Sequence, residues 1–257
     1  MVQSLKGKRI LITRPGHQAD VLVDKLNSLD AEALRFPTIE IKTSSHCQQQ
    51  LDIKHSIVNY DIALFVSRNA VEHAFKILDV SDLIGRVKIG VVGKGSLDCL
   101  AQYGIQNAEL PNKTYDSEGL LTSELLQQVD GKKIIIFRGQ EGRNLLGDTL
   151  QERGATVDYC EVYRRCIPQI KEADYNKVFH KPPHLAIFTS SEGLLHAYKM
   201  LSAEDGEKLL DIPWLLISER MKKTAYTLGH NSDIIIAQQA SDDGIVSSLT
   251  NYTFNSE

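Results

Sequence analysis

The chain has 257 residues, a formal net charge of −4, and 42% hydrophobic and 24% charged residues. This length allows one large domain or two ordinary ones, and the apolar content is typical of a globular protein rather than a disordered chain. The negative charge disfavours a nucleic-acid-binding protein, although a small acidic ligand can still meet a local basic patch.

The apolar runs are short, and a membrane-spanning helix needs about 20 consecutive apolar residues. The N-terminus also lacks the long apolar segment of a signal peptide, so we expect a cytoplasmic protein that does not bind membranes. The four cysteines, Cys47, Cys99, Cys160 and Cys166, form no C-x-x-C pattern, and the eight histidines do not cluster. We therefore expect free thiols and no metal site.

We predict strands, in chain order, at 9–13, 61–66, 88–92, 107–110, 133–137, 184–189, 213–218 and 233–237, most of which are continuous runs rich in Ile, Val and Leu. Such runs are typical of parallel strands that are covered on both faces. Helical patterns lie between them. Apolar stripes include residues 21, 22, 25, 26 and 29, and then Val71, Ala74, Phe75 and Leu78. Alternating strands and helices predict an α/β fold with parallel sheets.

The chain also repeats itself at an offset of about 124 residues. "KRILITRPGHQ" (8–18) resembles "KKIIIFRGQEG" (132–142), and "DIALFVSRNAVEHAF" resembles "HLAIFTSSEGLLHAY". The sequence therefore predicts two copies of one α/β module.

Two extended, β-rich segments occupy equivalent places in the two copies, "EALRFPTIEIKT" (32–43) and "VDYCEVYRRCIP" (157–168). We expect Pro37 and Pro168 to keep these segments out of a central ladder. Long extended segments of this kind can run between two lobes. Each lobe then takes its first β–α unit from one module and the remainder from the other.

Together, "LITRP", "FPTIEI", "FVSRNAV", "VVGKGS", "EVYRR" and "FTSSEGLLHAY" resemble uroporphyrinogen-III synthase over essentially the whole chain. The resemblance implies two doubly wound parallel-sheet lobes, one of them discontinuous, joined by a two-stranded β connector. The expected lobes are 1–36 with 169–257, and 37–168. The implied activity is closure of hydroxymethylbilane, a linear tetrapyrrole polycarboxylate, to uroporphyrinogen III with inversion of ring D and loss of water. It implies a monomeric lyase of haem biosynthesis that uses no metal or organic cofactor.

Four strand-to-helix turns place small hydroxyls or glycine at a helix start, and ligands of doubly wound sheets bind at this edge. The candidate substrate-binding residues are Ser67, Arg68, Gly93, Lys94, Ser96, Ser190, Ser191 and Ser218, with Arg14 and Arg138 as further countercharges. For the serines the competing interpretation is helix capping alone, and for the arginines and the lysine a solvated surface position. If two such edges face each other, they form one cleft for a ligand with eight carboxylates.

Tyr163 is the candidate catalytic residue, because the resemblance places the tyrosine of a Val-Tyr motif at the cleft. Loss of the hydroxyl group of hydroxymethylbilane needs a proton, and a phenol is a suitable donor at neutral pH. The competing interpretation is a packing residue on the connector, a role that better suits Tyr159.

Two other functions stay open at this stage. A dinucleotide site is suggested by Gly93 and Gly95, but Asp98 stands where the third glycine of G-x-G-x-x-G belongs. The alternative to catalysis is a bilobed protein that binds or senses a small anion.

Overall fold

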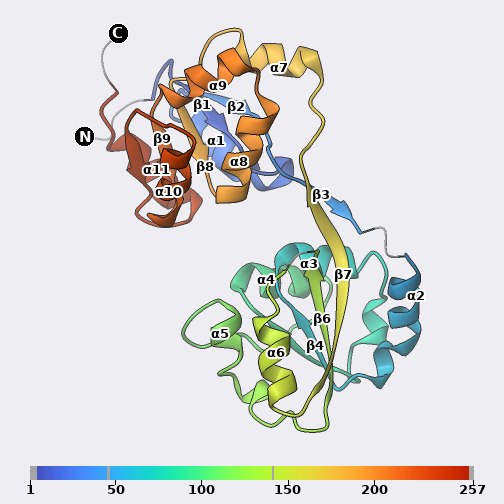
Figure 1. The fold of residues 1–257 in the computed structure, drawn as a ribbon. Coiled ribbons are helices and arrows are strands. Elements are labelled where there is room, and N and C mark those ends of the chain that lie inside the picture. The colour runs from blue at the N-terminus through green and yellow to red at the C-terminus, as the bar shows by residue number, and fades with distance from the viewer. Residues whose placement is uncertain (1–4, 45–46, 141, 255–257) are drawn as a thin grey trace. The chain divides into compact units, whose positions relative to one another are not determined.

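The computed structural model describes residues 5–44, 47–140 and 142–254, and the chain divides into two compact units (Figure 1). Unit 1 comprises Met1–Glu40 and Cys166–Glu257, and unit 2 comprises Ile41–Arg165. The division falls within a few residues of the boundaries expected at 36/37 and 168/169. Unit 1 is therefore discontinuous and unit 2 continuous in the sequence.

Unit 1 contains a five-stranded sheet with the order β10-β9-β8-β1-β2, in which all neighbours are parallel. Its strands are β1 (Arg9–Ile12), β2 (Glu32–Arg35), β8 (Leu185–Phe188), β9 (Trp214–Leu216) and β10 (Ile234–Ile236). Its helices are α1 (Asp20–Asn27), α7 (Glu172–Phe179), α8 (Ser191–Met200), α9 (Ala203–Leu210), α10 (Arg220–Thr227) and α11 (Asp242–Thr250).

Unit 2 contains the second sheet, with the order β3-β7-β6-β4-β5, in which β7, β6, β4 and β5 are parallel. Its strands are β3 (Glu40–Thr43), β4 (Ile62–Phe65), β5 (Lys88–Val91), β6 (Lys133–Gly139) and β7 (Thr156–Cys166). Its helices are α2 (Cys47–Ser56), α3 (Arg68–Ala74), α4 (Lys94–Gln102), α5 (Ser117–Leu120) and α6 (Leu145–Glu152).

The two sheets show how the internal repeat is used. In unit 1 the β1–α1–β2 segment comes from the first module and β8, β9 and β10 from the second, whereas unit 2 combines β4 and β5 with β6–α6–β7. The predicted α/β class, with two parallel-sheet lobes, is confirmed. The counterpart of β10 in unit 2 is reduced to one parallel bridge between Gly90 and Glu109, so the strand predicted at 107–110 does not form.

The expectation that the two prolines keep the extended segments out of a central ladder was wrong for 157–168, whose strand β7 lies inside its sheet, but not for 32–43, whose strands β2 and β3 stand at sheet edges. β2 pairs with β1, and β7 lies between β6 and β3. Pro37 follows the end of β2 and Pro168 follows the end of β7, so neither removes an amide that the ladder needs. β3 and β7 are neighbours in the sheet, and the Ser44 amide donates to the Val162 carbonyl, so these strands form the β connector where the chain passes between units.

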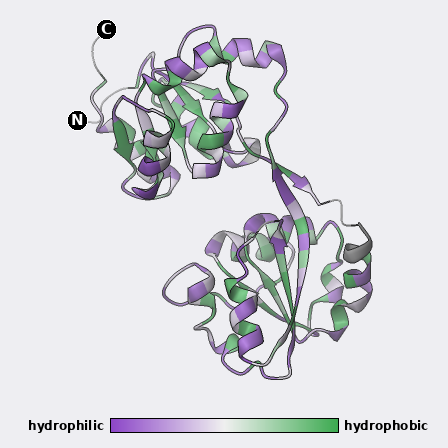
Figure 2. Ribbon diagram, viewed as in Figure 1, coloured by the Kyte–Doolittle hydropathy of each residue, from purple (hydrophilic) through white to green (hydrophobic). Residues whose placement is uncertain are grey.

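Helices cover both faces of each sheet, which explains the continuous apolar strands. In Figure 2 the strands are predominantly hydrophobic and the helices are mixed. In unit 2 one core lies between the sheet and α2, α3 and α4, and a second core lies between the sheet and α5 and α6. One detail of the predicted stripe was wrong, because Val21 is 57% exposed and Val23 is buried with Leu22 and Leu26 on α1.

A buried histidine makes the stability of unit 1 depend on pH. The His230 ring lies 4.0 Å from the ring of Trp214, centroid to centroid, and its Nδ1 accepts the Ser232 amide. Its Nε2 is buried and has no hydrogen-bond partner within the described ranges. Burial lowers the pKa of His230 below its usual 6.5, although Asp211 raises it in part. The folded unit therefore keeps this imidazole neutral at pH values at which the unfolded chain protonates it.

We predict that the free energy of unfolding of unit 1 is highest above about pH 6.5 and falls as the pH drops below that value, because the unfolded chain then binds the extra proton. Trp214 is the single tryptophan of the sequence and is fully buried, so its fluorescence during urea unfolding reports on unit 1. His230→Asn keeps an acceptor for Ser232 and removes the titrating group, so it should flatten this pH dependence. An unchanged pH dependence in the variant would contradict the prediction.

Candidate active site in unit 2

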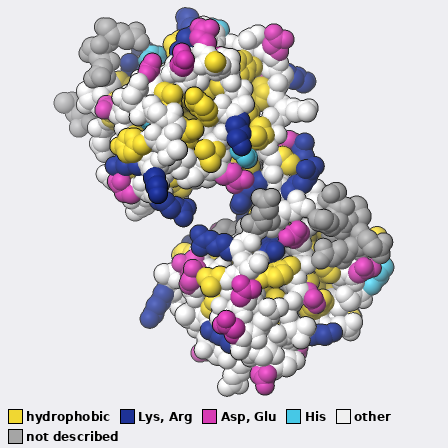
Figure 3. All heavy atoms as spheres, in the orientation of Figure 1, with side chains coloured by type: hydrophobic (Ala, Val, Ile, Leu, Met, Phe, Trp, Pro, Cys, Tyr) yellow, Lys and Arg dark blue, Asp and Glu magenta, His cyan; other side chains and the backbone are white. Residues whose placement is uncertain are grey.

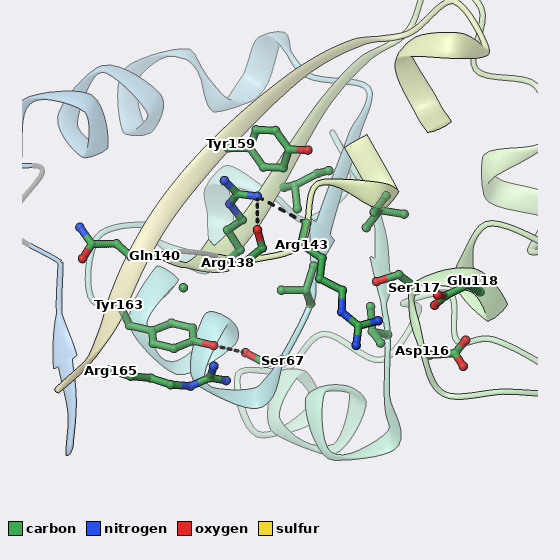
Figure 4. A pocket seen from close by; sticks show the side chains of 16 residues that line it. Ser67, Asp116, Ser117, Glu118, Arg138, Gln140, Arg143, Tyr159, Tyr163 and Arg165 are labelled. Atoms are coloured by element: carbon green, nitrogen blue, oxygen red, sulfur yellow. Dashed lines mark hydrogen bonds between the residues drawn. The ribbon is translucent and has the colours of Figure 1, made fainter. Parts of the chain in front are cut away.

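A cavity of about 370 Å³ opens at the carboxyl edge of the unit 2 sheet. It lies where β4, β5 and β6 end, next to the turns that lead into α3, α4 and α6, and all of its lining residues belong to unit 2 (Figure 4). Its polar lining comprises Ser67, Asp116, Ser117, Glu118, Arg138, Gln140, Arg143, Tyr159, Tyr163 and Arg165. The cavity thus occupies the place where doubly wound sheets bind ligands.

Tyr163 reaches this cavity because β7 contains a bulge. The β6–β7 register pairs Arg138 with Glu161 and then Gly139 with Tyr163, so Val162 is an extra residue. In a regular strand residues two apart share a face, and Tyr163 would then lie on the face of Tyr159. With the extra residue, Tyr163 instead packs in the same core as Val162, on the side of α3 and α4.

The Tyr163 hydroxyl is held by Ser67. The two oxygens are 3.2 Å apart, and the tyrosine side chain is almost fully buried, with 3% exposure (Figure 4). Ser67 is also the N-cap of α3, where its oxygen accepts the Ala70 amide at 3.1 Å. This contact leaves the serine hydroxyl hydrogen available to the tyrosine oxygen. The capping interpretation of Ser67 is therefore correct, and the same side chain also contacts Tyr163.

Arg138 lines the cavity, but its charge is already compensated. One guanidinium nitrogen lies 3.2 Å from Glu161 Oε1 and the other donates to Asn144 Oδ1 at 2.8 Å. The guanidinium stacks on Tyr159 at 3.8 Å from the ring centroid, and the side chain is only 12% exposed. Arg138 therefore ties the turn before α6 to β7, and its ion pair weakens it as a countercharge for a ligand.

Two further arginines line the cavity, and neither was among the candidate residues predicted from the sequence. Arg143 follows the β6 turn and is exposed, and its guanidinium has no hydrogen-bond or ion-pair partner among residues 5–44, 47–140 and 142–254. Arg165 lies two residues beyond Tyr163 and so shares its face of β7. The two-residue spacing from Tyr163 predicts that Arg165 lies at the same site. No periodic pattern predicts the position of Arg143, because this residue lies in a turn.

The other candidates of unit 2 lie at the same sheet edge but outside the cavity lining. Arg68 begins α3 and forms an ion pair with Glu72 at 2.8 Å. Gly93 is the N-cap of α4, and the exposed Lys94 is the first residue of that helix. Ser96 is buried beneath the first turn, with 3% exposure. These residues share the edge with Tyr163 without joining its hydrogen bonds.

The remaining candidates belong to unit 1. Ser190 is the N-cap of α8 and accepts the Gly193 amide at 2.9 Å, and Ser191 is the first residue of that helix. Ser218 follows β9, and its carbonyl accepts the Met221 amide. Arg14 follows β1 and forms an ion pair with Asp242, so its charge is compensated within the unit. All four lie at the carboxyl edge of the unit 1 sheet.

Basic and acidic side chains are interspersed on the face of each unit visible in Figure 3. Across the described ranges, no group of three or more His, Cys, Asp or Glu side chains is arranged to hold a metal ion, and no helix is long and apolar enough to cross a membrane. Cys99, Cys160 and Cys166 are free, and burial raises the pKa of the Cys160 thiol to about 12. The side chain of Cys47 lies outside the described part of the chain.

Comparison with known proteins gives a consistent result. The family model described as "Uroporphyrinogen-III synthase HemD" matches residues 4–247. The uroporphyrinogen-III synthase of Escherichia coli (strain K12) is 31% identical over 244 residues, covering 93% of this chain and 99% of that protein. The enzyme of that name from Synechococcus elongatus is 28% identical over 211 residues, 79% of this chain and 78% of that protein.

Two solved structures share the fold. Uroporphyrinogen-III synthetase from Helicobacter pylori 26695 aligns with a TM-score of 0.65 at 13% identity, covering 95% of this chain and 99% of that chain. A mutant uroporphyrinogen III synthase from the extremely thermophilic bacterium Thermus thermophilus aligns with a TM-score of 0.60 at 15% identity, covering 96% and 100%. At these identities the likeness concerns the fold alone.

Proposed function

The chain belongs to the uroporphyrinogen-III synthase family, and from that premise we propose that it cyclises hydroxymethylbilane to uroporphyrinogen III, with inversion of ring D and loss of water. The observation that supports this function most strongly is the position of Tyr163. Its hydroxyl lies against Ser67 at a polar cavity on the ligand-binding edge of an α/β sheet.

The reaction begins with loss of the terminal hydroxyl group. Protonation of that oxygen breaks the carbon–oxygen bond, releases water and leaves an azafulvene cation. The substituted carbon of ring D attacks this electrophile and forms a spiro intermediate, which fragments and closes again with the ring reversed. The sequence is neutral in oxidation state, so it needs a proton donor and a fixed geometry rather than an electron carrier.

In this proposal the Tyr163 hydroxyl gives its proton to the departing oxygen. Ser67 donates to the phenol oxygen while accepting the Ala70 amide, so it supports the negative charge that develops on Tyr163 as the proton leaves. Burial of the ring restricts its motion, so the hydroxyl needs little reorganisation before the reaction. Closure of the macrocycle then releases the proton of the ring D carbon that forms the new bond, and solvent water carries this proton back to the phenolate, so each turnover is proton-neutral.

The substrate carries eight carboxylates, which bind countercharges and amides at the sheet edges. Arg143 and Arg165 at the cavity extend the predicted set of Arg68, Lys94 and the turn residues Gly93 and Ser96. Arg14, Ser190, Ser191 and Ser218 are proposed for the same role in unit 1. Several such contacts, each worth about 1.5–3 kcal/mol when charged and desolvated, hold a polyanion without a dense basic patch. The proposed enzyme is monomeric and cytoplasmic, and its ligand is a small molecule.

Arg143→Gln should raise KM by up to about fivefold and leave kcat nearly unchanged, because an exposed ion pair contributes at most about 1 kcal/mol and binds substrate and transition state equally. Arg86→Gln is the matched control, since Arg86 is also exposed but precedes β5, at the opposite edge of the same sheet. Steady-state kinetics with hydroxymethylbilane measure both variants. A KM for Arg143→Gln that equals that of the control would contradict this assignment.

A protein that only binds or senses an anion is the alternative, and turnover number distinguishes it. The chain is added to hydroxymethylbilane at roughly one-hundredth of the substrate concentration, and cyclised product is followed against spontaneous closure. We expect many equivalents of product per chain above the spontaneous rate. A chain that alters the fate of at most one equivalent would be a binding protein and would refute the enzyme.

A further inference from the structure

Gly139, the last residue of β6, lies directly beneath the ring of Tyr163. The two residues are partners in the β6–β7 register, immediately after the bulge at Val162. A Cβ atom placed on Gly139 would lie 2.7 Å from Cε2 and Cζ of Tyr163 and 3.0 Å from its hydroxyl oxygen. Contacts with carbon below 3.0 Å are essentially never observed, so a side chain at 139 and the present ring position are incompatible.

The backbone does not explain this glycine. Gly139 is not one of the glycines with positive φ, so its conformation is open to any residue. What requires the missing side chain is the ring of Tyr163. The aromatic ring occupies the volume that a Cβ at 139 would need.

The ring also has little room to move away. Tyr163 is 3% exposed and packs in the core between the sheet and α3 and α4. The His73 ring lies 5.8 Å from it, centroid to centroid, and the hydroxyl is held by Ser67 at 3.2 Å. Because close-packed interiors relax only partially, a methyl group at 139 must displace the ring and with it the hydroxyl.

We propose that Gly139 is a positioning residue for the reaction: its missing side chain, together with the Val162 bulge, lets the Tyr163 ring cross β6 so that the hydroxyl meets Ser67 at the cavity. The bulge selects the face of the sheet, and Gly139 provides the space on that face. This inference rests on the proposed function, in which the Tyr163 hydroxyl donates a proton.

A second glycine supplies a matched control. A Cβ on Gly147 of α6 would lie 1.9 Å from the hydroxyl oxygen of Tyr159. Gly147 therefore also leaves space for a tyrosine that lines the same cavity. Tyr159 lies on the other face of β7, where it packs in the core of α5 and α6. Gly147→Ala therefore disturbs packing beside the cavity without acting on Tyr163.

The test is a double-mutant cycle on the full chain. Gly139→Ala, Tyr163→Phe and the double variant are assayed for kcat and KM, below their measured unfolding temperatures. We expect Gly139→Ala to lower kcat roughly 10²-fold, the scale of a misplaced catalytic group, with KM nearly unchanged. In the Tyr163→Phe background the same substitution should lower kcat no further, because no hydroxyl remains to be placed. Gly147→Ala should change kcat by the same factor in the wild-type background and in the Tyr163→Phe background.

Equal losses of kcat for Gly139→Ala in both backgrounds, or no loss in the wild-type background, would overturn the role of Gly139 but not the proposed function. A wild-type chain without turnover would overturn it together with the proposed function. If Gly139→Ala does not fold, Tyr163→Ala is combined with it to remove the ring. Recovery of folding in that pair supports the contact between residue 139 and the ring, and failure to recover rejects it.

Discussion

Tyr163→Phe should lower kcat about 10²- to 10⁴-fold, the contribution typical of a positioned general acid. The substitution removes only the hydroxyl oxygen and leaves the buried ring in its core, so we expect a small change in stability. KM should change little, because the proton is transferred only in the transition state. Steady-state kinetics with hydroxymethylbilane, corrected for spontaneous closure, measure the effect.

Tyr159→Phe is the control for this experiment. It also removes one phenol oxygen at the cavity, but that hydroxyl donates to the Asn144 carbonyl and lies on the other face of β7. We expect its kcat to stay within a few-fold of wild type, because a hydrogen bond of this kind contributes only about 1 kcal/mol. Similar losses for the two tyrosines would mean that Tyr163 acts through packing rather than proton donation.

The second large effect concerns the interleaving of the two modules. A fragment of residues 41–165 should fold on its own, whereas a fragment of residues 1–128, which is the whole first module, should not. The first fragment contains the unit 2 sheet except for two end residues, Glu40 of β3 and Cys166 of β7. The second lacks β6, which pairs with β4 in unit 2, and β8, which pairs with β1 in unit 1.

The missing strands carry the centre of each core. Loss of β6 removes Ile134, Ile135, Ile136 and Phe137, all of which are buried. Each such side chain contributes about 1.5–3 kcal/mol, so together they approach or exceed the whole stability of a small domain. Urea unfolding followed by circular dichroism should show a cooperative transition for 41–165 and none for 1–128. A cooperative transition of the 1–128 fragment would show that the sequence repeat is also a folding unit.

Much of the fold is readable from the sequence because parallel strands with helices on both faces leave unmistakable runs of buried residues. The runs at 133–137 and 184–189 predict β6 and β8, and the repeat predicts their equivalents, β1 and β4. The strand predicted at 107–110 was wrong, because a segment of four residues with two polar side chains does not reveal whether it pairs with its neighbour through more than one bridge. The expectation for Pro168 was wrong because the effect of a proline depends on whether it stands inside a strand or just beyond its end, and the sequence pattern does not fix the ends of strands.

The site was predicted in part, and the reasons differ by residue. Tyr163 was identified through the family resemblance, but its contact with Ser67 depends on the Val162 bulge, which no spacing in the sequence reveals. Arg138 was expected to face the substrate, yet Glu161, two residues from Tyr163, compensates its charge. Local patterns place side chains on a strand face, whereas ion pairing depends on which strands become neighbours.

Product stereochemistry tests the central claim most directly. Spontaneous closure of hydroxymethylbilane gives isomer I, in which ring D is not inverted, so the two isomers report separately on the enzyme and on the background. The purified chain is given hydroxymethylbilane, and uroporphyrinogen isomers I and III are separated chromatographically. Predominance of isomer III is the predicted result. Formation of isomer I alone, at the rate of the reaction without protein, would contradict the assignment of this chain as a synthase.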